Sequence, residues 1–414
     1  MKLTYKLIFT FNLWLLIITS LGIRFVLKFK SFTSKKRDKK GNKLKILFLE
    51  NQTSNHAGAY YRVEIVKERL ERDGINVDIH YPFTKKEFDS YNESKIDKHL
   101  LLSIMLIRKF KAILSTTKYD LVIVRRELLH HFEYGGLYFE KLLIALNNHT
   151  ILDMDDYMPF LRKNPNQKKS LFGKINLSLP TKAIDVLNLY PFFTVAMESF
   201  LAAADVRNTE TKDKKYHVFP MCVDYPIKTK EYSNSSKPKK IGWISQSIHF
   251  KRIDEIVPFL NSAYDQIPYE LIIVADRPYE NIELKVPIQF IPWSLDKELD
   301  IMLSFDIGIA PIFIKKEEQS KKGTFKLVQY MSLGLVSIVT DLPYTRNQIK
   351  DGYNGYLVQS NEDWTSKILQ SLRLSGEELN DLGKNAYNSF YKSHHIDNQY
   401  PLLRDFYKEV AKLN

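Results

Sequence analysis

The sequence has a single cysteine, Cys222, among its 414 residues. One cysteine excludes an intramolecular disulfide and a metal site built from several cysteines, and it suits a reducing compartment. The glycine pattern GxGxxG is also missing from the loop at 51–61, which follows the first predicted strand. Nicotinamide dinucleotide binding is therefore not favoured.

Acidic residues are scarce in the first 45 positions, where twelve lysines and arginines face Asp38 alone. This segment carries a net +11 of the chain's formal +13, so the remaining chain is close to neutral. A near-neutral body behind a basic segment is typical of attachment to a membrane surface rather than of a groove that follows nucleic-acid phosphates. We expect a membrane surface, and no nucleic acid, among the partners.

Residues 7–23 contain no charge and one amide, Asn12. As a helix this run rises about 25 Å, the short end of the length that crosses a bilayer. A cleaved signal peptide is disfavoured because the residues after Thr19 (SLGIR) form a poor cleavage site. Both a spanning helix and a helix in the interface remain open. The ten basic residues at 24–45 would keep the body cytoplasmic, so we expect a membrane-associated protein whose folded domains are cytoplasmic.

Alternating strand and helix patterns fill the rest of the chain, and near-continuous isoleucine and valine runs predict strands that are covered on both faces. Two polar, lysine-rich stretches without apolar periodicity predict linkers. The expected organisation is a membrane anchor at 1–30, a basic linker at 31–43, a Rossmann-like domain at 44–225, a linker at 226–239, a second Rossmann-like domain at 240–390 and a C-terminal helix at 391–414.

The predicted fold class is α/β, with two doubly wound parallel sheets facing across a cleft and an N-terminal membrane-associating helix. Ligands bind at the carboxyl ends of the strands in such folds. Individual elements are expected as a helix over 62–73, a strand over 217–220, one continuous helix over 253–266 and a helix over 322–332.

The stretch 305–364 carries the most specific pattern. A buried strand ends at Pro311, a basic loop follows, and the sequence KGTFK at 322–326 opens a helix that Gly334 ends. Free N–H groups at a helix start, with Lys322 and Lys326 on either side, form an anion site suited to a diphosphate. Without such a ligand, the two lysines would be a solvated helix start.

This stretch resembles the C-terminal domain of the retaining glycosyltransferases of family 4, formerly called group 1, which have two Rossmann domains and the GT-B fold. The likeness covers most of 45–390 and is more specific in the second half. The matching positions are Gly323, Lys326, Gln329, Tyr330, Met331, Gly352, Gly355, Trp364, Asp306 and the pair Gly242-Trp243.

The resemblance implies a nucleotide-diphosphate sugar as co-substrate in the second domain, an acceptor in the first, and retention of configuration. It implies no obligatory metal or other cofactor. A metal-independent enzyme must supply positive charge to the departing diphosphate. The resemblance assigns this role to Lys251 and Lys326. It assigns donor binding to Gly242, Arg252, Lys322, Gly323, Thr324 and Gln329.

One departure from the family concerns a pair of glutamates eight positions apart, where this chain has Lys321 and Gln329. An amide at Gln329 can still hydrogen-bond a ribose hydroxyl, but Lys321 cannot replace an acid. One branch of the family shares this form. Glu317 and Glu318 either replace the acid in part or lie in a solvated loop.

In the first domain, Gly58 permits close approach of the backbone to a ligand, and Arg62 opens the next helix. The resemblance places the acceptor, and part of the donor phosphate contact, at this loop. Asp153 and Asp155 follow a buried strand. Their carboxylates indicate metal binding or acid–base chemistry, and the resemblance implies that they position the acceptor or the sugar; Asp156 is equally suited to capping a helix.

These features predict a retaining hexosyltransferase that acts on a lipid-linked or membrane-associated glycan, as in the synthesis of a cell-surface polysaccharide or a glycolipid. The loss of both glutamates leaves open a non-catalytic nucleotide-sugar-binding subunit. A related GT-B enzyme, such as an epimerase or a polyol-phosphate transferase, is a third hypothesis. The last helix is expected to cross back to the first domain and act in closure.

Overall fold

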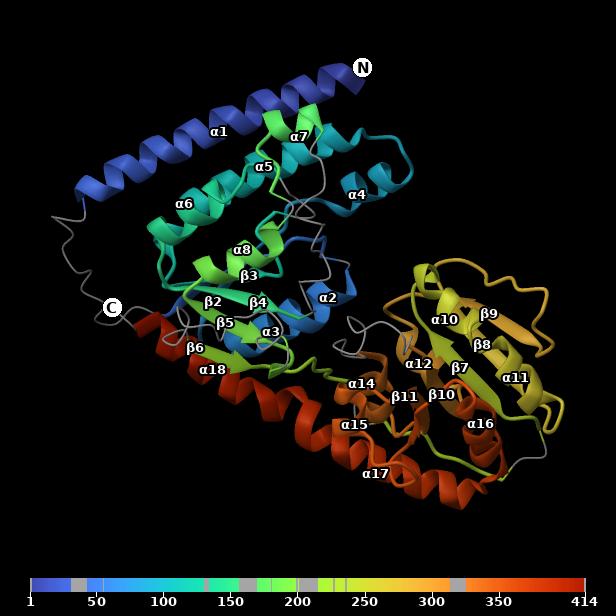
Figure 1. The fold of residues 1–414 in the computed structure, drawn as a ribbon. Helices are drawn as coiled ribbons and strands as arrows, with labels where there is room; N and C mark the ends of the chain where they lie inside the picture. The colour runs from blue at the N-terminus through green and yellow to red at the C-terminus, as the bar shows by residue number, and fades with distance from the viewer. Residues whose placement is uncertain are drawn as a thin grey trace. The chain divides into compact units, whose positions relative to one another are not determined.

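The chain divides into two compact units, Met1–Pro220 with Tyr400–Asn414, and Met221–Gln399, shown in Figure 1. Each unit is described by itself. The computed structural model describes residues 2–30, 43–54, 56–129, 134–155, 170–179, 181–198, 200, 215–225, 228–234, 237–312 and 325–412.

The first unit contains a parallel sheet of six strands in the order β2-β1-β3-β4-β5-β6. Its strands are β1 (Lys45–Leu49), β2 (Asn76–His80), β3 (Leu121–Arg125), β4 (Thr150–Met154), β5 (Phe192–Val195) and β6 (Lys215–Val218). β3 and β4 are buried at every position, as their apolar runs predict. The last strand lies two residues before its predicted position.

Helices cover both faces of this sheet. Leu47 and Val124 share one core with residues of α1, α5 and α6, while Phe48, which points to the other face, lies 6.4 Å from Tyr407 of α18 between ring centroids. The helices of this unit are α1 (Lys2–Lys30), α2 (Ala57–Ala59), α3 (Ile65–Arg72), α4 (Lys85–Asn92), α5 (Lys98–Ser115), α6 (Tyr138–Leu146), α7 (Leu171–Ile175), α8 (Lys182–Leu189) and most of α18 (Ile396–Lys412).

The first crossover helix begins earlier than predicted. A short helix, α2, leads into a π-helical turn over Tyr60–Glu64, and α3 continues from Ile65. A wider turn of this kind rotates the following side chains relative to a regular helix. Arg62 lies in the turn and is buried, rather than standing at an exposed helix start.

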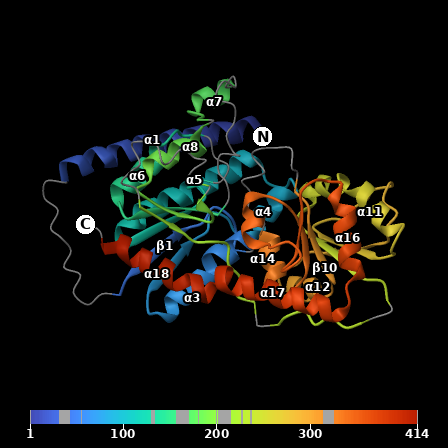
Figure 2. The ribbon, with the colours of Figure 1, turned by 60° about the horizontal axis from the view of Figure 1, so that its bottom comes forward.

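The N-terminal helix α1 packs along α5 and α6 (Figures 1 and 2). Phe9, Leu13 and Ile17 are buried in the core of the first unit. Among the described residues, the stretch Lys2–Lys28 is long and apolar enough to cross a membrane by length and composition. A buried helix and a signal sequence meet the same criterion.

The second unit has its own six-stranded parallel sheet, ordered β12-β11-β10-β7-β8-β9. Its strands are β7 (Lys240–Ile244), β8 (Glu270–Ala275), β9 (Ile288–Pro292), β10 (Ile307–Ala310), β11 (Ser337–Thr340) and β12 (Tyr356–Val358). Its helices are α10 (Lys251–Asp254), α11 (Val257–Tyr264), α12 (Glu298–Leu303), α14 (Phe325–Ser332), α15 (Pro343–Gln348), α16 (Asp363–Arg373) and α17 (Gly376–His394).

The prediction of one continuous helix over 253–266 is wrong, because α10 ends at Asp254 and α11 begins at Val257. Pro258 explains the break. A proline lacks an N–H and restricts the residue before it, so it suits the first turn of a new helix but not the middle of a long one. Gly334, with φ +60°, follows the end of α14 as predicted.

Candidate functional site

The topology of each sheet locates one switch point, where successive connections leave in opposite directions. It lies between β1 and β3 in the first unit and between β7 and β10 in the second. Ligands of doubly wound sheets bind at the carboxyl edge beside such a point. The loops that follow these four strands are therefore the candidate site loops.

In the second unit, Lys326 stands in the first turn of α14 and is partly buried. Its Nζ donates a hydrogen bond to Oε1 of Gln329 at 3.1 Å. Gln329 is fully buried, and its Nε2 donates to the Tyr225 hydroxyl at 2.6 Å and to Oε1 of Glu298 at 3.1 Å. The amide that was predicted to read a ribose is thus engaged on both sides by protein groups.

Glu298 is the centre of this network and was not identified from the sequence. It is buried at the start of α12, where its Oε1 accepts from Tyr225 at 2.8 Å and its Oε2 accepts from the indole Nε1 of Trp293 at 3.0 Å. A buried carboxylate is costly unless it is hydrogen-bonded or paired, and these donors meet that need. In the sequence it resembles any acid in a first helical turn.

Burial lowers the pKa of Lys326, and the negative charge of Glu298 opposes that shift. Its ammonium is therefore easier to deprotonate than that of an ordinary lysine. An arriving anion favours the charged form. The charge of Lys326 therefore depends both on Glu298 and on whether an anion is bound. In the sequence, Lys326 lies just after the residues that were predicted to bind a diphosphate.

Lys251 begins α10, shortly after β7 ends. Its side chain is exposed and makes no ion pair with the described part of the chain, whereas the neighbouring Arg252 is partly buried. The turn before it is fixed by Ser247, whose backbone N–H and hydroxyl donate to Asp276 at 2.6 and 2.7 Å. The loop thus presents a cation at the carboxyl end of β7.

Gly242 lies within β7, and a Cβ there would come within 2.0 Å of the Phe305 ring. Packing alone requires a glycine at this position; donor binding by Gly242 stays a prediction. Lys322, Gly323 and Thr324 lie outside the described residues.

In the first unit, the loop after β1 approaches the end of β3. A Cβ on Gly58 would lie 2.2 Å from Nη2 of Arg125, so the glycine makes room for this guanidinium. Arg125 is itself buried and donates from Nη1 to Oε1 of Glu50 at 2.8 Å. The predicted close approach at Gly58 is therefore to a protein side chain.

Asp153 and Arg62 form a buried pair. Nε of Arg62 donates to Oδ2 of Asp153 at 2.9 Å and its Nη2 donates to Oδ1 at 2.7 Å, while the Thr194 hydroxyl also donates to Oδ1. Burial disfavours charged Arg62, but Asp153 outweighs it and raises the arginine pKa. The remaining Arg62 nitrogen donates to the carbonyls of Phe219 and Pro220.

Asp155 is held by two arginines at the end of β3. One oxygen accepts from Nη2 of Arg125 and the other lies 2.7 Å from Nε of Arg126. Burial disfavours its charged form, but the arginines prevail and lower its pKa. The carboxylates of Asp153 and Asp155 therefore serve ion pairs in this structure. Within the described ranges, no group of three potential His, Cys, Asp or Glu metal ligands occurs.

His56 lies beside this cluster. Burial and the charges of Arg125 and Arg126 lower its pKa to about 4. Its Nδ1 accepts a hydrogen bond from the N–H of Gly58 at 3.1 Å, which leaves the proton of the neutral ring on Nε2. The loop thus carries a neutral donor next to Arg126, which has φ +60° and is partly exposed.

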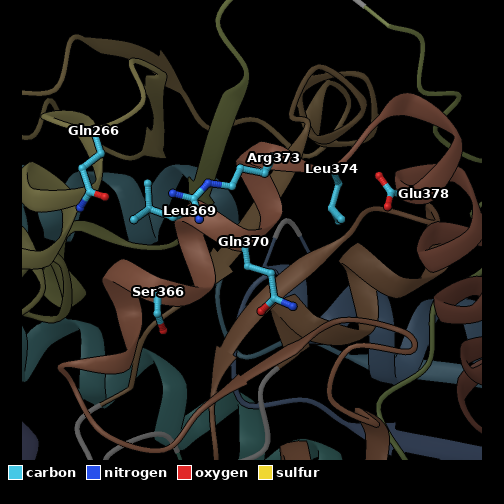
Figure 3. A pocket seen from close by; sticks show the side chains of 7 residues that line it. All are labelled: Gln266, Ser366, Leu369, Gln370, Arg373, Leu374 and Glu378. Atoms are coloured by element: carbon cyan, nitrogen blue, oxygen red, sulfur yellow. The ribbon is translucent and has the colours of Figure 1, made fainter.

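A cavity of about 500 Å³ in the second unit is lined by side chains of α16 and α17 and by Gln266, as Figure 3 shows. Lys239, directly before β7, donates to the Leu372 and Leu374 carbonyls at the end of α16. The cavity therefore lies toward the amino ends of the strands, the opposite edge from Lys326. We do not assign it to the nucleotide.

The two sheets, with their switch points and covering helices, define the GT-B fold of nucleotide-sugar glycosyltransferases. Residues 239–373 match the model of the family described as glycosyl transferases group 1. This match covers the second unit from β7 through α16. No curated protein sequence matches the chain.

Solved structures agree with this fold at low sequence identity. A glycosyltransferase from Rickettsia africae is 15% identical, with a TM-score of 0.61 over 90% of this chain and 100% of that one. Sucrose-phosphate synthase from Thermosynechococcus elongatus is 12% identical, with a TM-score of 0.60 over 89% and 99%. HepE from Anabaena, solved with UDP-glucose, is 13% identical, with a TM-score of 0.59 over 88% and 100%.

Proposed function

We propose that this protein is a retaining glycosyltransferase of family 4. It transfers a hexose from a nucleotide-diphosphate sugar to a lipid-linked or membrane-associated glycan, in the synthesis of a cell-surface polysaccharide or a glycolipid. No metal is required. The observation that carries the proposal is the position of Lys251 and Lys326 at the starts of α10 and α14, the helices that follow the two strands beside the switch point of the second sheet.

The chemistry follows from charge. When the sugar–phosphate bond breaks, the diphosphate gains negative charge and the sugar becomes cationic. The side chain of Lys251 is exposed and forms no ion pair with a carboxylate of the described residues, so it is available to the diphosphate. Lys326 is held by Gln329 beside Glu298, and a bound dianion favours its charged form. Cations placed in advance, where charge develops, stabilise the transition state.

The first unit supplies the acceptor side in this proposal. Arg62 and Asp153 hold the start of the helix, and Arg125 with Asp155 holds the end of β3. These pairs fix the loop that carries Gly58 and His56. The carboxylates act by positioning this loop, not by accepting a proton.

The protein is further proposed to work at the cytoplasmic face of a membrane, in keeping with the apolar helix α1 and the basic segment that follows it. A membrane location brings the enzyme to a lipid-linked acceptor.

A thermal-shift screen against UDP-, GDP-, ADP- and dTDP-sugars tests donor binding, because a ligand that binds only the folded state raises the unfolding temperature. UDP-glucose is the first donor to try. Turnover of the stabilising donor is then followed in the presence of EDTA, with the anomeric configuration read by NMR. If no nucleotide sugar stabilises the protein, or none is turned over, the proposal fails.

A non-catalytic binding subunit is the second candidate, favoured by the absence of the paired glutamates. It predicts donor binding without turnover, and Lys326→Ala then has no rate to lower. Mass spectrometry of the products separates transfer from epimerisation and from polyol-phosphate transfer.

A further inference from the structure

One face of helix α1 packs against the rest of the first unit. Phe9, Leu13, Ile17 and Ser20 are all buried, at the spacing of one helical face. The Ser20 hydroxyl donates to the Tyr138 carbonyl of α6 at 3.3 Å, and the indole of Trp14 donates to the Ile175 carbonyl of α7 at 3.1 Å. The contacts run along most of the apolar stretch rather than at one end.

The opposite face of α1 is apolar and exposed. Phe11 is 68% exposed, and Leu7 and Ile18 are each 63% exposed. At ~100° per residue, the large exposed side chains of α1 fall within an arc of roughly 140°, centred opposite the buried face. The large apolar side chains of this outer face are Leu3, Leu7, Ile8, Phe11, Trp14, Leu15, Ile18, Leu21, Phe25 and Val26, and the small residues Thr4 and Gly22 are exposed within the same arc.

Helix α7 adds to this apolar surface. Leu171 and Ile175 are one helical turn apart and both are exposed, and Trp14 bonds to the backbone of Ile175. Phe172 instead faces the core, where its ring lies 6.1 Å from that of Phe9. The short helix therefore buries one side and presents the other beside α1.

Basic residues lie at the two ends of α1. Lys2 and Lys6 precede the apolar stretch at 7–23, and Arg24 and Lys28 follow it. On the helical wheel all four fall on the side of the buried face or next to it, so none of them interrupts the outer face. An apolar face with basic residues at both ends of the helix matches a lipid surface with anionic head groups, which long basic side chains can reach.

We propose that the outer face of α1, with Leu171 and Ile175 of α7, docks onto an anionic lipid surface with α1 lying in the membrane plane rather than across it. A spanning α1 would have to leave α5 and α6 and expose Phe9, Leu13 and Ile17 of the unit's own core. In the plane, the helix keeps those contacts while the outer face enters the acyl boundary. The inference refines the membrane attachment proposed above and does not depend on sugar transfer.

Vesicle flotation of the full-length protein tests the surface. We expect binding to phosphatidylcholine vesicles containing phosphatidylglycerol, weaker binding to phosphatidylcholine alone, and at least about tenfold weaker binding of Phe11→Ser/Ile18→Ser. Ile282→Ser, at a fully exposed apolar position of the second unit, is the matched control and keeps wild-type binding. Wild-type flotation of Phe11→Ser/Ile18→Ser overturns the proposal.

Orientation is tested by Lys2→Cys and by Lys28→Cys, one at either end of the helix, each in a Cys222→Ser background. An impermeant maleimide added outside protein-bound vesicles labels both positions if α1 lies in the plane. Protection of one position until the vesicles are opened shows a spanning helix and overturns the proposal. A dimer that Phe11→Ser/Ile18→Ser dissociates, without vesicle binding by wild type, assigns the face to a second copy instead.

Donor turnover in detergent separates this proposal from the catalytic one. Phe11→Ser/Ile18→Ser keeps the wild-type unfolding temperature and the wild-type rate with a soluble acceptor, because neither residue is near a strand end. Lost flotation with retained turnover supports the surface. Retained flotation in a protein that turns over no donor rejects the enzyme proposal and leaves the surface standing.

Discussion

Charged side chains at the carboxyl edges of the two sheets differ in their burial and in their partners. In the first unit, Arg62 and Arg125 are buried and each is bonded to a buried carboxylate. In the second, Lys251 is exposed and Lys326 bonds only to an amide among the described residues. Buried pairs give rigidity, whereas cations without a carboxylate partner remain available to an anionic ligand. The same kind of edge thus serves as a scaffold in one unit and as a candidate donor site in the other.

The largest expected effect comes from breaking the buried ion pair between Arg62 and Asp153 in the first unit. Arg62→Met leaves Asp153 buried without its partner, and we expect a loss of about 3–5 kcal/mol in the free energy of unfolding. Chemical denaturation of the full chain measures it. The double variant Arg62→Met/Asp153→Leu removes both charges and recovers part of the loss. A cost below about 0.5 kcal/mol for Arg62→Met, typical of an exposed pair, would contradict the comparison.

For the proposed donor site, we expect a substitution to change the rate more than the stability. Lys326→Ala is expected to lower turnover by about 10²–10³-fold, because the proposed function places its cation at the departing diphosphate. Its stability changes by only about 1 kcal/mol, the net contribution of one hydrogen bond. Lys350→Ala, at an exposed lysine of the same unit, is the control. Equal rates for the two variants would remove Lys326 from the mechanism.

Glu298→Gln removes the negative charge that favours the charged form of Lys326. Without the carboxylate, the pKa of Lys326 falls further, so the alkaline limb of kcat/KM moves to lower pH. We expect the loss of kcat/KM to grow as the pH rises and the activity to recover at lower pH. Glu280→Gln, an exposed change in the same unit, serves as the reference. A uniform loss at every pH would indicate that Glu298 only packs the network.

The smallest expected effect is on the pH dependence of stability, and it comes from buried histidines that lie in different units. Burial lowers the pKa of His394 in the second unit to about 4, as burial with nearby basic charges does for His56 and His80 in the first. The unfolded state binds these protons from its ordinary pKa of 6.5, so stability falls as pH drops from 6.5 toward 4. His394→Asn should lower that slope by about 1 kcal/mol per pH unit. An unchanged slope in stability measurements across this range would contradict it.

Strands and the end of α14 follow from the sequence because their causes are local. Doubly covered strands need continuous apolar runs, and Gly334 supplies the positive φ that ends a helix. The partners of Asp153 are not local. Arg62 is 91 positions away and Thr194 is 41 positions away, so the sequence showed carboxylates at a strand end without showing that they are already paired. Two of the partners of Glu298 are likewise distant in the chain, so its role in the network could not be predicted from the sequence.

Helix α18 links residues far apart in the chain. Its start belongs to the second unit, and from Tyr400 onward it belongs to the first, where Tyr400 and Arg404 bond to Asp73. The buried ring of Tyr407 and side chain of Val410 complete that unit from the other end of the chain. During translation, the first unit therefore lacks the cover that α18 gives to Phe48 until nearly the whole sequence shown has been made.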